Sequence, residues 1–206
     1  MDEKICQGSL SLLLKGENEG LRQHMGGSST QIFTIGHSTH PLEEFIAILQ
    51  AYGIAHLVDV RTVPRSRHNP QFNRDTLPES LAAAQITYTH MPGLGGLRRP
   101  LPDSINLGWI NESFRGYADY MQTHEFEAQL QELIELAKQS RVAMMCAEAV
   151  PWRCHRSLIA DALTVRGFEV VDIYNRTRSQ LHKVTPWANI EGFRITYPPS
   201  NPNEQD

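Results

Sequence analysis

The chain has 206 residues, of which 40% are hydrophobic and 20% are charged, and its formal net charge is −4. These values are ordinary for a soluble globular protein, and the negative charge argues against a generally basic nucleic-acid binder. No apolar run approaches the roughly 20 residues that span a bilayer, and no signal-peptide core followed by a small-residue cleavage site is present. We therefore expect a cytoplasmic protein without a membrane partner.

The cysteine and cation content adds two constraints. The chain has only three cysteines, one of them Cys6 near the N-terminus, which do not make a disulfide framework and fit a reducing compartment. Of the 19 cations, 15 are Arg. Because the Arg guanidinium grips phosphate or carboxylate through two parallel hydrogen bonds, the positions of the arginines are informative about a ligand.

The first 30 residues show no sustained periodicity, and we interpret 1–30 as a loose extension, with Met25 as a hypothetical true initiator. Short apolar runs rich in β-branched residues follow and predict buried strands at 31–35, 56–60, 86–90, 141–145 and 168–173. Apolar residues at helical spacing lie between these runs and predict helices between Pro41 and Gly53, at 77–84, around 114–121, at 125–138 and at 157–166.

Strands that alternate with helices indicate a mainly parallel sheet of about five strands, covered by helices on its faces. We expect a single α/β domain over residues 31–180 and an irregular tail over 181–206. Residues 91–106 contain several glycines and prolines and should lack regular structure. A loop of this length in a compact domain is more often functional than not.

Polar residues gather where the predicted strands end. His37 and Ser38 follow the first strand, Arg61, Arg65 and Ser66 follow the second, and Gly95, Gly96 and Arg98 follow the third. The fourth strand leads into a segment with six reactive or charged residues, which are Cys146, Glu148, Arg153, Cys154, His155 and Arg156. In a parallel sheet all of these loops open on the same edge, where ligands bind.

Structural explanations compete with a functional one at the earlier loops. His37 and Ser38 fit a simple turn before a helix, and Asp59 and Arg61 fit an internal ion pair at a strand end. Arg65 and Arg67 fit either a ligand contact or a solvated loop. The glycines at 93–96 lack the spacing of a dinucleotide or Walker-type phosphate loop.

Cys154, His155 and Arg156 should open a helix, where the dipole and a neighbouring Arg stabilise a thiolate and where free amides bind anions. Cys146 could instead be a small core residue. Three chemistries remain open: a zinc site built from the cysteines with histidine, a disulfide, and a thiolate nucleophile with His155 or Glu148 as proton carrier. The spacing excludes the Cys-x5-Arg loop of cysteine phosphatases and the Cys-x-x-Cys motif of thioredoxins.

Taken together in order along residues 32–175, these motifs resemble those of the DUF488 family, a domain of unknown function. The motifs are Gly36-His37-Ser38, Asp59-Val-Arg61 with Pro64 and Ser66, Leu94-Gly-Gly96 with Arg98, Phe114-x-x-Tyr-Ala118-x-Tyr-Met121, and Cys146-x-Glu148 with Cys154-His-Arg156. The resemblance implies a single Rossmann-like three-layer domain. It implies no reaction, substrate or cofactor.

We expect an enzyme, a hydrolase or a transferase, that acts on a phosphate-bearing ligand such as a nucleotide or a nucleic-acid end. The expected catalytic residues are Cys146, Glu148, Cys154 and His155, and the expected ligand-binding residues are His37, Ser38, Asp59, Arg61, Arg65, Ser66, Gly95, Gly96, Arg98 and Arg156. We assign no metal and no cofactor, and the oligomeric state stays open. The alternatives are a non-catalytic module that binds a nucleotide or nucleic acid, and a zinc-stabilised domain.

Overall fold

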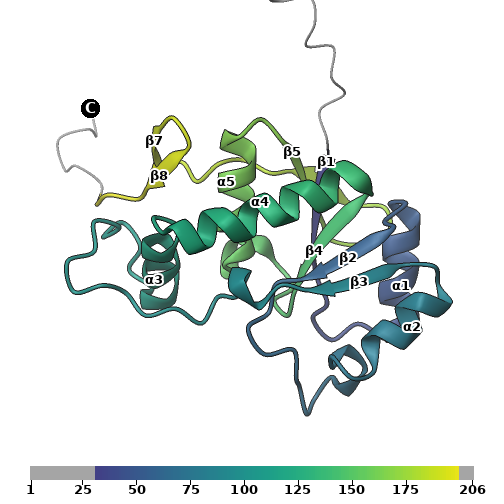
Figure 1. Cartoon of the computed structure of the whole chain (residues 1–206). Coiled ribbons are helices and arrows are strands. Elements are labelled where there is room, and N and C mark those ends of the chain that lie inside the picture. The colour runs from purple at the N-terminus through teal and green to yellow at the C-terminus, as the bar shows by residue number, and fades with distance from the viewer. Residues whose placement is uncertain (1–30, 200–206) are drawn as a thin grey trace, which may run out of the picture.

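Six strands form one sheet in the order β3-β2-β4-β1-β5-β6 in the computed structural model, which describes residues 31–199 (Figure 1). The first five in sequence are parallel to their neighbours: β1 (Gln31–Gly36), β2 (His56–Asp59), β3 (Thr87–His90), β4 (Val142–Cys146) and β5 (Glu169–Ile173). The edge strand β6 (Ser179–Leu181) pairs antiparallel with β5. The N-terminal extension and the start site that we considered at Met25 lie outside the described residues.

Five α-helices connect the strands: α1 (Leu42–Ala51), α2 (Leu77–Ala83), α3 (Glu112–Tyr120), α4 (His124–Gln139) and α5 (Arg156–Val165). Three single 3₁₀ turns each begin with a proline: η1 (Pro70–Phe72), η2 (Pro92–Leu94) and η3 (Pro151–Arg153). Asn111 and Thr123 cap α3 and α4 by accepting hydrogen bonds from backbone amides of the first turn. No helix in residues 31–199 is long and apolar enough to cross a membrane.

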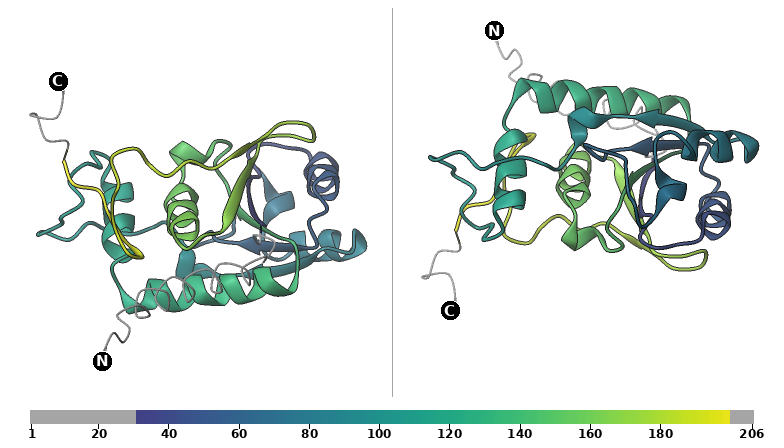
Figure 2. Two further views of the ribbon diagram at one scale, coloured as in Figure 1. Left: turned by 90° about the horizontal axis from the view of Figure 1, so that it is seen from above. Right: turned by 90° about the horizontal axis from the view of Figure 1, so that it is seen from below.

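The helices cover both faces of the sheet, so that the domain has three layers (Figure 2). One core packs α1 and α2 against side chains such as Phe33, Leu57 and Met145. The other packs α3, α4 and α5 against side chains such as Val58 and Met144. Successive residues of β2 and β4 thus serve opposite cores, which explains why these strands are continuous apolar runs.

The expected fold is confirmed. Each of the five predicted strands is present, each predicted helix is present within two residues of its expected bounds where these were given, and the domain is a Rossmann-like α/β sandwich with a mainly parallel sheet. Residues 91–111 contain only the η2 turn, as the glycines and prolines predict.

The chain after Tyr174 contains more structure than its sequence pattern suggests. Besides β6, it forms a small hairpin of β7 (Asn189–Glu191) and β8 (Arg194–Thr196), which lies near α5 in Figure 1. Each of these strands has only three residues, too few to show a periodicity. The hairpin is held by Ile195 and Tyr197, which are buried against the α3–α5 core.

A buried polar cluster ties this C-terminal segment to the sheet. His182 lies 2.8 Å from Asp161 of α5 and 3.3 Å from Asp172 of β5, and the Tyr197 hydroxyl donates to the second oxygen of Asp161 at 2.8 Å. Burial lowers the pKa of His182, but the hydrogen bonds and charges of the two aspartates outweigh it and raise the pKa to about 9. His182 is therefore an imidazolium between two carboxylates at neutral pH.

We predict that this cluster makes stability depend on pH. Because the folded pKa of His182 exceeds the unfolded value near 6.5, its stabilisation is complete below pH 6.5 and is lost as the pH rises through about 9. The shift corresponds to about 3 kcal/mol in the free energy of unfolding. Urea unfolding of wild type and His182→Gln at pH 6 and pH 9.5 should show the two stabilities converging at the higher pH. A constant difference between them would contradict the prediction.

Candidate functional site

The connection from β4 to α5 brings the reactive residues together. Cys146 is the last residue of the buried strand β4, and Cys154 follows the η3 turn just before α5. Both thiols are reduced and buried, with 6% and 2% of each residue exposed. Residues 147–149 between them are exposed, so the chain leaves the sheet and returns within one loop.

The two thiols and one imidazole nitrogen form a close group. Nδ1 of His155 lies 3.7 Å from Sγ of Cys154 and 4.0 Å from Sγ of Cys146, and all three atoms are within 4.8 Å of one another. The other nitrogen, Nε2, donates to the carbonyl oxygen of Val60 at 3.2 Å, because a carbonyl oxygen only accepts. This hydrogen bond fixes the ring so that Nδ1 faces both sulfur atoms.

The environment separates the acidities of the two thiols. A hydrogen bond from Cys154 lowers the pKa of Cys146 well below its usual value; burial opposes this shift, and His155 and the charge of Arg156 reinforce it. Burial, together with Cys146, raises the pKa of Cys154 well above its usual value. Cys146 is therefore the thiolate of the pair, and Cys154 is the thiol that donates to it.

A solvent-connected pocket of about 310 Å³ opens over this group. Its wall includes Cys146, Cys154 and His155, and its rim includes Glu148 and Arg153. Glu148 and Arg153 are exposed, and their side chains make no hydrogen bond or ion pair within residues 31–199. The pocket thus combines a thiolate, an imidazole, a carboxylate and a guanidinium; we refer to it as the thiol pocket.

Two glycines allow the loops to approach one another. A Cβ atom at Gly96 would overlap the imidazole of His155, and one at Gly36 would overlap the carbonyl oxygen of Glu148. The ring of Tyr117 also packs on His155, with 5.0 Å between ring centroids. The loop after β3 therefore packs closely against the imidazole, and the end of β1 packs against the loop from Cys146 to Cys154, which we call the thiol loop. This close packing holds both in place.

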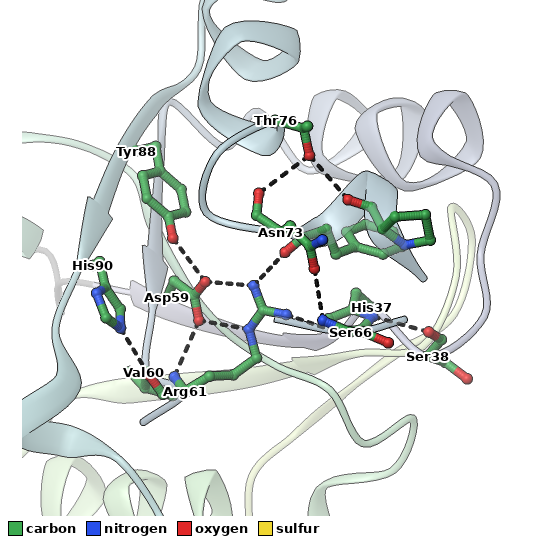
Figure 3. A network of polar contacts seen from close by, with 12 residues as sticks. His37, Ser38, Asp59, Val60, Arg61, Ser66, Asn73, Thr76, Tyr88 and His90 are labelled. Atoms are coloured by element: carbon green, nitrogen blue, oxygen red, sulfur yellow. Dashed lines mark hydrogen bonds and ion pairs between the residues drawn. The ribbon is translucent and has the colours of Figure 1, made fainter. Parts of the chain in front are cut away.

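The loop after β2 forms a second polar network, in which Arg61 is bound by the protein itself (Figure 3). Its guanidinium donates to both carboxylate oxygens of Asp59, at 2.9 and 2.6 Å, to the carbonyl of Phe72 and to Nε2 of His37. Burial, helped by the charge of Arg61, lowers the pKa of His37 to about 4. His37 is therefore neutral, and Asp59, Arg61 and His37 form an internal structural unit.

Two other arginines that we expected to bind a ligand also bind the protein. Arg156 is fully buried and donates to Thr34 Oγ1 and to the carbonyl oxygens of Glu148 and Ala149. Arg98 donates to the carbonyls of Gly93 and Gly95 and covers the ring of Tyr120, with 3.6 Å from its guanidinium carbon to the ring centroid. The guanidinium of Arg156 is thus buried and bound by groups of the protein itself.

The remaining expected residues divide into those near the thiol pocket and those away from it. Gly96 lines the pocket, and Gly95 packs against Thr62, which also lines it. Ser66 closes its own loop, because its amide donates to Asn73 and its hydroxyl accepts from the Asn69 amide. Arg65 is exposed, and Ser38 accepts a hydrogen bond from His37 through its carbonyl.

Several lining residues carry no signal that sequence reasoning could use. Thr62, Val63 and Leu97 line the thiol pocket, but each is an ordinary loop residue in the sequence. Phe114 also lines it and belongs to a motif of the family resemblance, but nothing in that motif predicts a place at the pocket. Arg153 was visible in the same reactive segment, yet we did not include it among the expected ligand contacts. Its lack of a side-chain partner within residues 31–199 is what distinguishes Arg153 from Arg61, Arg98 and Arg156.

Fold and pocket together define the class: a Rossmann-like α/β domain with a thiolate–imidazole group at the carboxyl edge of its parallel sheet. The chain belongs to the DUF488 family, described as a domain of unknown function, whose family model matches residues 41–163. This match confirms the resemblance carried by the sequence motifs. No curated protein and no solved structure matches the chain.

We predict that Cys146 is alkylated faster than Cys154. In a Cys6→Ser background, iodoacetamide at pH 7 should label Cys146 first, because the thiolate is the nucleophile. Cys154→Ala should move the rate–pH profile of Cys146 to higher pH by removing the hydrogen bond that lowers its pKa. Peptide mass spectrometry reads out both effects.

Cys154→Ser is the matched control, since its hydroxyl can still donate a hydrogen bond and should leave most of the shift in place. Labelling of Cys154 before Cys146, or identical rate–pH profiles in wild type and Cys154→Ala, would contradict the assignment.

Proposed function

We propose that this protein is an enzyme that uses Cys146 as a nucleophile on an anionic, phosphate-bearing substrate bound in the thiol pocket. The observation that carries the proposal is the convergence of Cys146, Cys154 and His155 in the wall of a solvent-connected pocket with Glu148 and Arg153 at its rim. A thiolate held beside an imidazole whose other nitrogen is fixed by a hydrogen bond is the arrangement that nucleophilic catalysis requires.

The residues suggest the following course. The thiolate of Cys146 forms a bond to the electrophilic atom of the substrate, and the bond to the leaving group breaks. Glu148, exposed at the rim, is placed to give a proton to that leaving group in its acid form and then to take one from the incoming water or acceptor. Attack by water or the acceptor releases the product and restores the thiolate, which makes the reaction a hydrolysis or a group transfer.

The substrate class rests on the cations that are free to act. Arg153 lines the thiol pocket without an internal partner within residues 31–199, so its guanidinium can pair with a phosphate. Arg65 and Arg67 are exposed on the loop whose first residues, Thr62 and Val63, line the same pocket. Arg61 also lines the thiol pocket, but its guanidinium already donates to Asp59, Phe72 and His37. Arg98 and Arg156 act indirectly, by shaping the loops.

Activity of variants tests the nucleophile. With p-nitrophenyl phosphate and bis-p-nitrophenyl phosphate as probes, we expect turnover by wild type, a loss of a hundredfold or more in Cys146→Ser, and about tenfold or more in Glu148→Gln. Arg153→Ala should mainly raise KM. The matched control is Glu43→Gln, which changes an exposed glutamate on α1 at no pocket. Turnover that persists unchanged in Cys146→Ser would refute the proposal.

A second candidate uses the same three atoms as zinc ligands. For tetrahedral zinc, bonds of about 2.3 Å to sulfur and about 2.0 Å to nitrogen imply a sulfur–nitrogen separation of roughly 3.6 Å. The observed separations from His155 Nδ1 are 3.7 and 4.0 Å. The hydrogen bond from Nε2 to a carbonyl is also the usual support of a metal-bound histidine. The fourth position would face the thiol pocket, where zinc would activate a bound water.

Metal content separates the two candidates, because zinc would occupy the sulfur lone pair that a nucleophile needs. We expect untagged wild-type protein to contain much less than one zinc per chain by elemental analysis, and added zinc to inhibit turnover. One zinc per chain, lost in both Cys146→Ser and Cys154→Ser, together with activity that chelation removes and zinc restores, would replace the nucleophile by a metal centre.

A further inference from the structure

All three tryptophans of the chain line a second pocket. Trp109 comes from the loop before α3, Trp152 from η3, and Trp187 from the segment after β6. Together with Tyr174 they line a cavity of about 380 Å³, which we call the tryptophan pocket. It shares no lining residue with the thiol pocket.

The aromatic rings leave flat surface exposed to solvent. Trp109 and Trp187 meet edge to face at 5.2 Å, and Trp152 and Tyr174 lie 6.4 Å apart, a separation that leaves each ring face only partly covered by the other. Trp152 is 63% exposed and Trp187 is 43% exposed. Large aromatic side chains that converge from three distant segments and remain this exposed in a pocket are typical of a binding site for a planar ligand.

The charges of the tryptophan pocket favour an uncharged ring over a cation. Asp172 lines the pocket but is paired with the His182 imidazolium, whose other carboxylate partner is Asp161. Lys183 also lines the pocket, and the guanidinium of Arg178 already covers the ring of Tyr174 at 5.2 Å. The two carboxylates are thus outnumbered by three cations, so no net negative charge remains to attract an ammonium group.

Polar groups at the pocket suit the edge of a heteroaromatic ring. The side-chain amide of Gln180 makes no hydrogen bond within residues 31–199, and a Gln amide can pair with a base edge as donor and acceptor at once. Nε1 of Trp109 is the one buried side-chain nitrogen or oxygen in residues 31–199 that lacks a partner. Lys183 adds a cation that can meet a phosphate attached to the ring.

We propose that the tryptophan pocket binds the nucleobase of a nucleotide, with the base stacked on Trp152 and Trp187, its edge paired with Gln180, and its phosphate near Lys183. Base stacking on aromatic side chains tolerates any base, while the amide pair adds preference. The proposal goes beyond the thiol chemistry and does not depend on it. The bound nucleotide would lie next to the thiol pocket, because Trp152 and Arg153 are adjacent residues that line the tryptophan pocket and the thiol pocket, respectively.

Binding is tested on the full chain with AMP, GMP, CMP and UMP as probes. We expect saturable quenching of tryptophan fluorescence by at least one of them, because every tryptophan of the chain lines the pocket. Isothermal titration calorimetry with the same nucleotide then provides a readout that does not depend on the tryptophans. The Cys146→Ser variant should bind as wild type does, which keeps this result separate from the outcome of the thiol reaction.

Substitution locates the site. Trp152→Ala should weaken the binding of that nucleotide by about tenfold or more, and Trp152→Phe should retain most of it, since removing a stacking ring costs roughly five- to hundredfold per base. The matched control is Phe193→Ala, which removes an aromatic ring of 64% exposure away from this pocket. Gln180→Ala should change the preference among the four nucleotides.

Three outcomes would overturn the proposal: no binding of any nucleotide, equal weakening by Trp152→Ala and Phe193→Ala, or saturable binding of choline in place of the nucleotides. The last outcome would make the pocket a cage for an organic cation instead. Loss of nucleotide binding in Cys146→Ser with none in Trp152→Ala would move the site to the thiol pocket.

Discussion

The arrangement of the site depends on one buried cation. Arg156 has no exposed surface and forms no ion pair with a carboxylate of residues 31–199, and it donates to Thr34 Oγ1 and to two carbonyls of the thiol loop. A buried charge is tolerated only when hydrogen bonds and an opposite charge compensate it. Here the compensation is relayed: the Thr34 hydroxyl donates to Asp172, which pairs with His182, which pairs with Asp161. Two cations and two carboxylates form a neutral buried network between the sheet, α5 and the C-terminal segment.

This buried polar network joins parts of the molecule that are far apart in sequence. At one end Arg156 holds the loop that carries the thiols, and at the other Asp161 accepts from Tyr197, whose amide donates to the buried Asn106. Asn106 in turn donates to Asp119 of α3 and so fixes the long loop after η2. The segment around η3 contributes lining residues to both pockets, so the same buried contacts support both. A substitution within this buried polar network is therefore expected to affect both pockets together. A substitution of the exposed Trp152 or Arg153 is expected to affect only the pocket that the residue lines.

The sequence predicts the fold better than the site, and the reason is physical. Strands such as 141–145 and helices such as 125–138 bury whole faces, so their apolar spacing is visible in the chain itself. The strands β6 to β8 are held by single buried side chains, such as Ile195 and Tyr197, and leave no periodic trace. The place of the reactive residues at the carboxyl edge of the sheet was predicted, because parallel strands end there. The sequence left open whether the two thiols meet. The partners of the arginines could not be predicted, since Arg61 reaches its carbonyl at Phe72 and Arg156 reaches Thr34 only after folding. The three tryptophans likewise gave no signal, because they converge from loops.

The arginines still bear on the chemistry, although by a different route from the one expected. Arg156 is buried, but its positive charge contributes to lowering the pKa of Cys146, and its backbone amide bonds to Cys154. Arg61 fixes the loop after β2 by its hydrogen bonds to Asp59. Arg98 fixes the glycine-containing loop after β3, which packs on His155. Because a guanidinium stays charged in any protein environment, these three positions supply a fixed field and a fixed shape that do not vary with pH. Arg153, next to the thiols and without a side-chain partner in the described part of the chain, is the lining arginine that we propose meets the substrate.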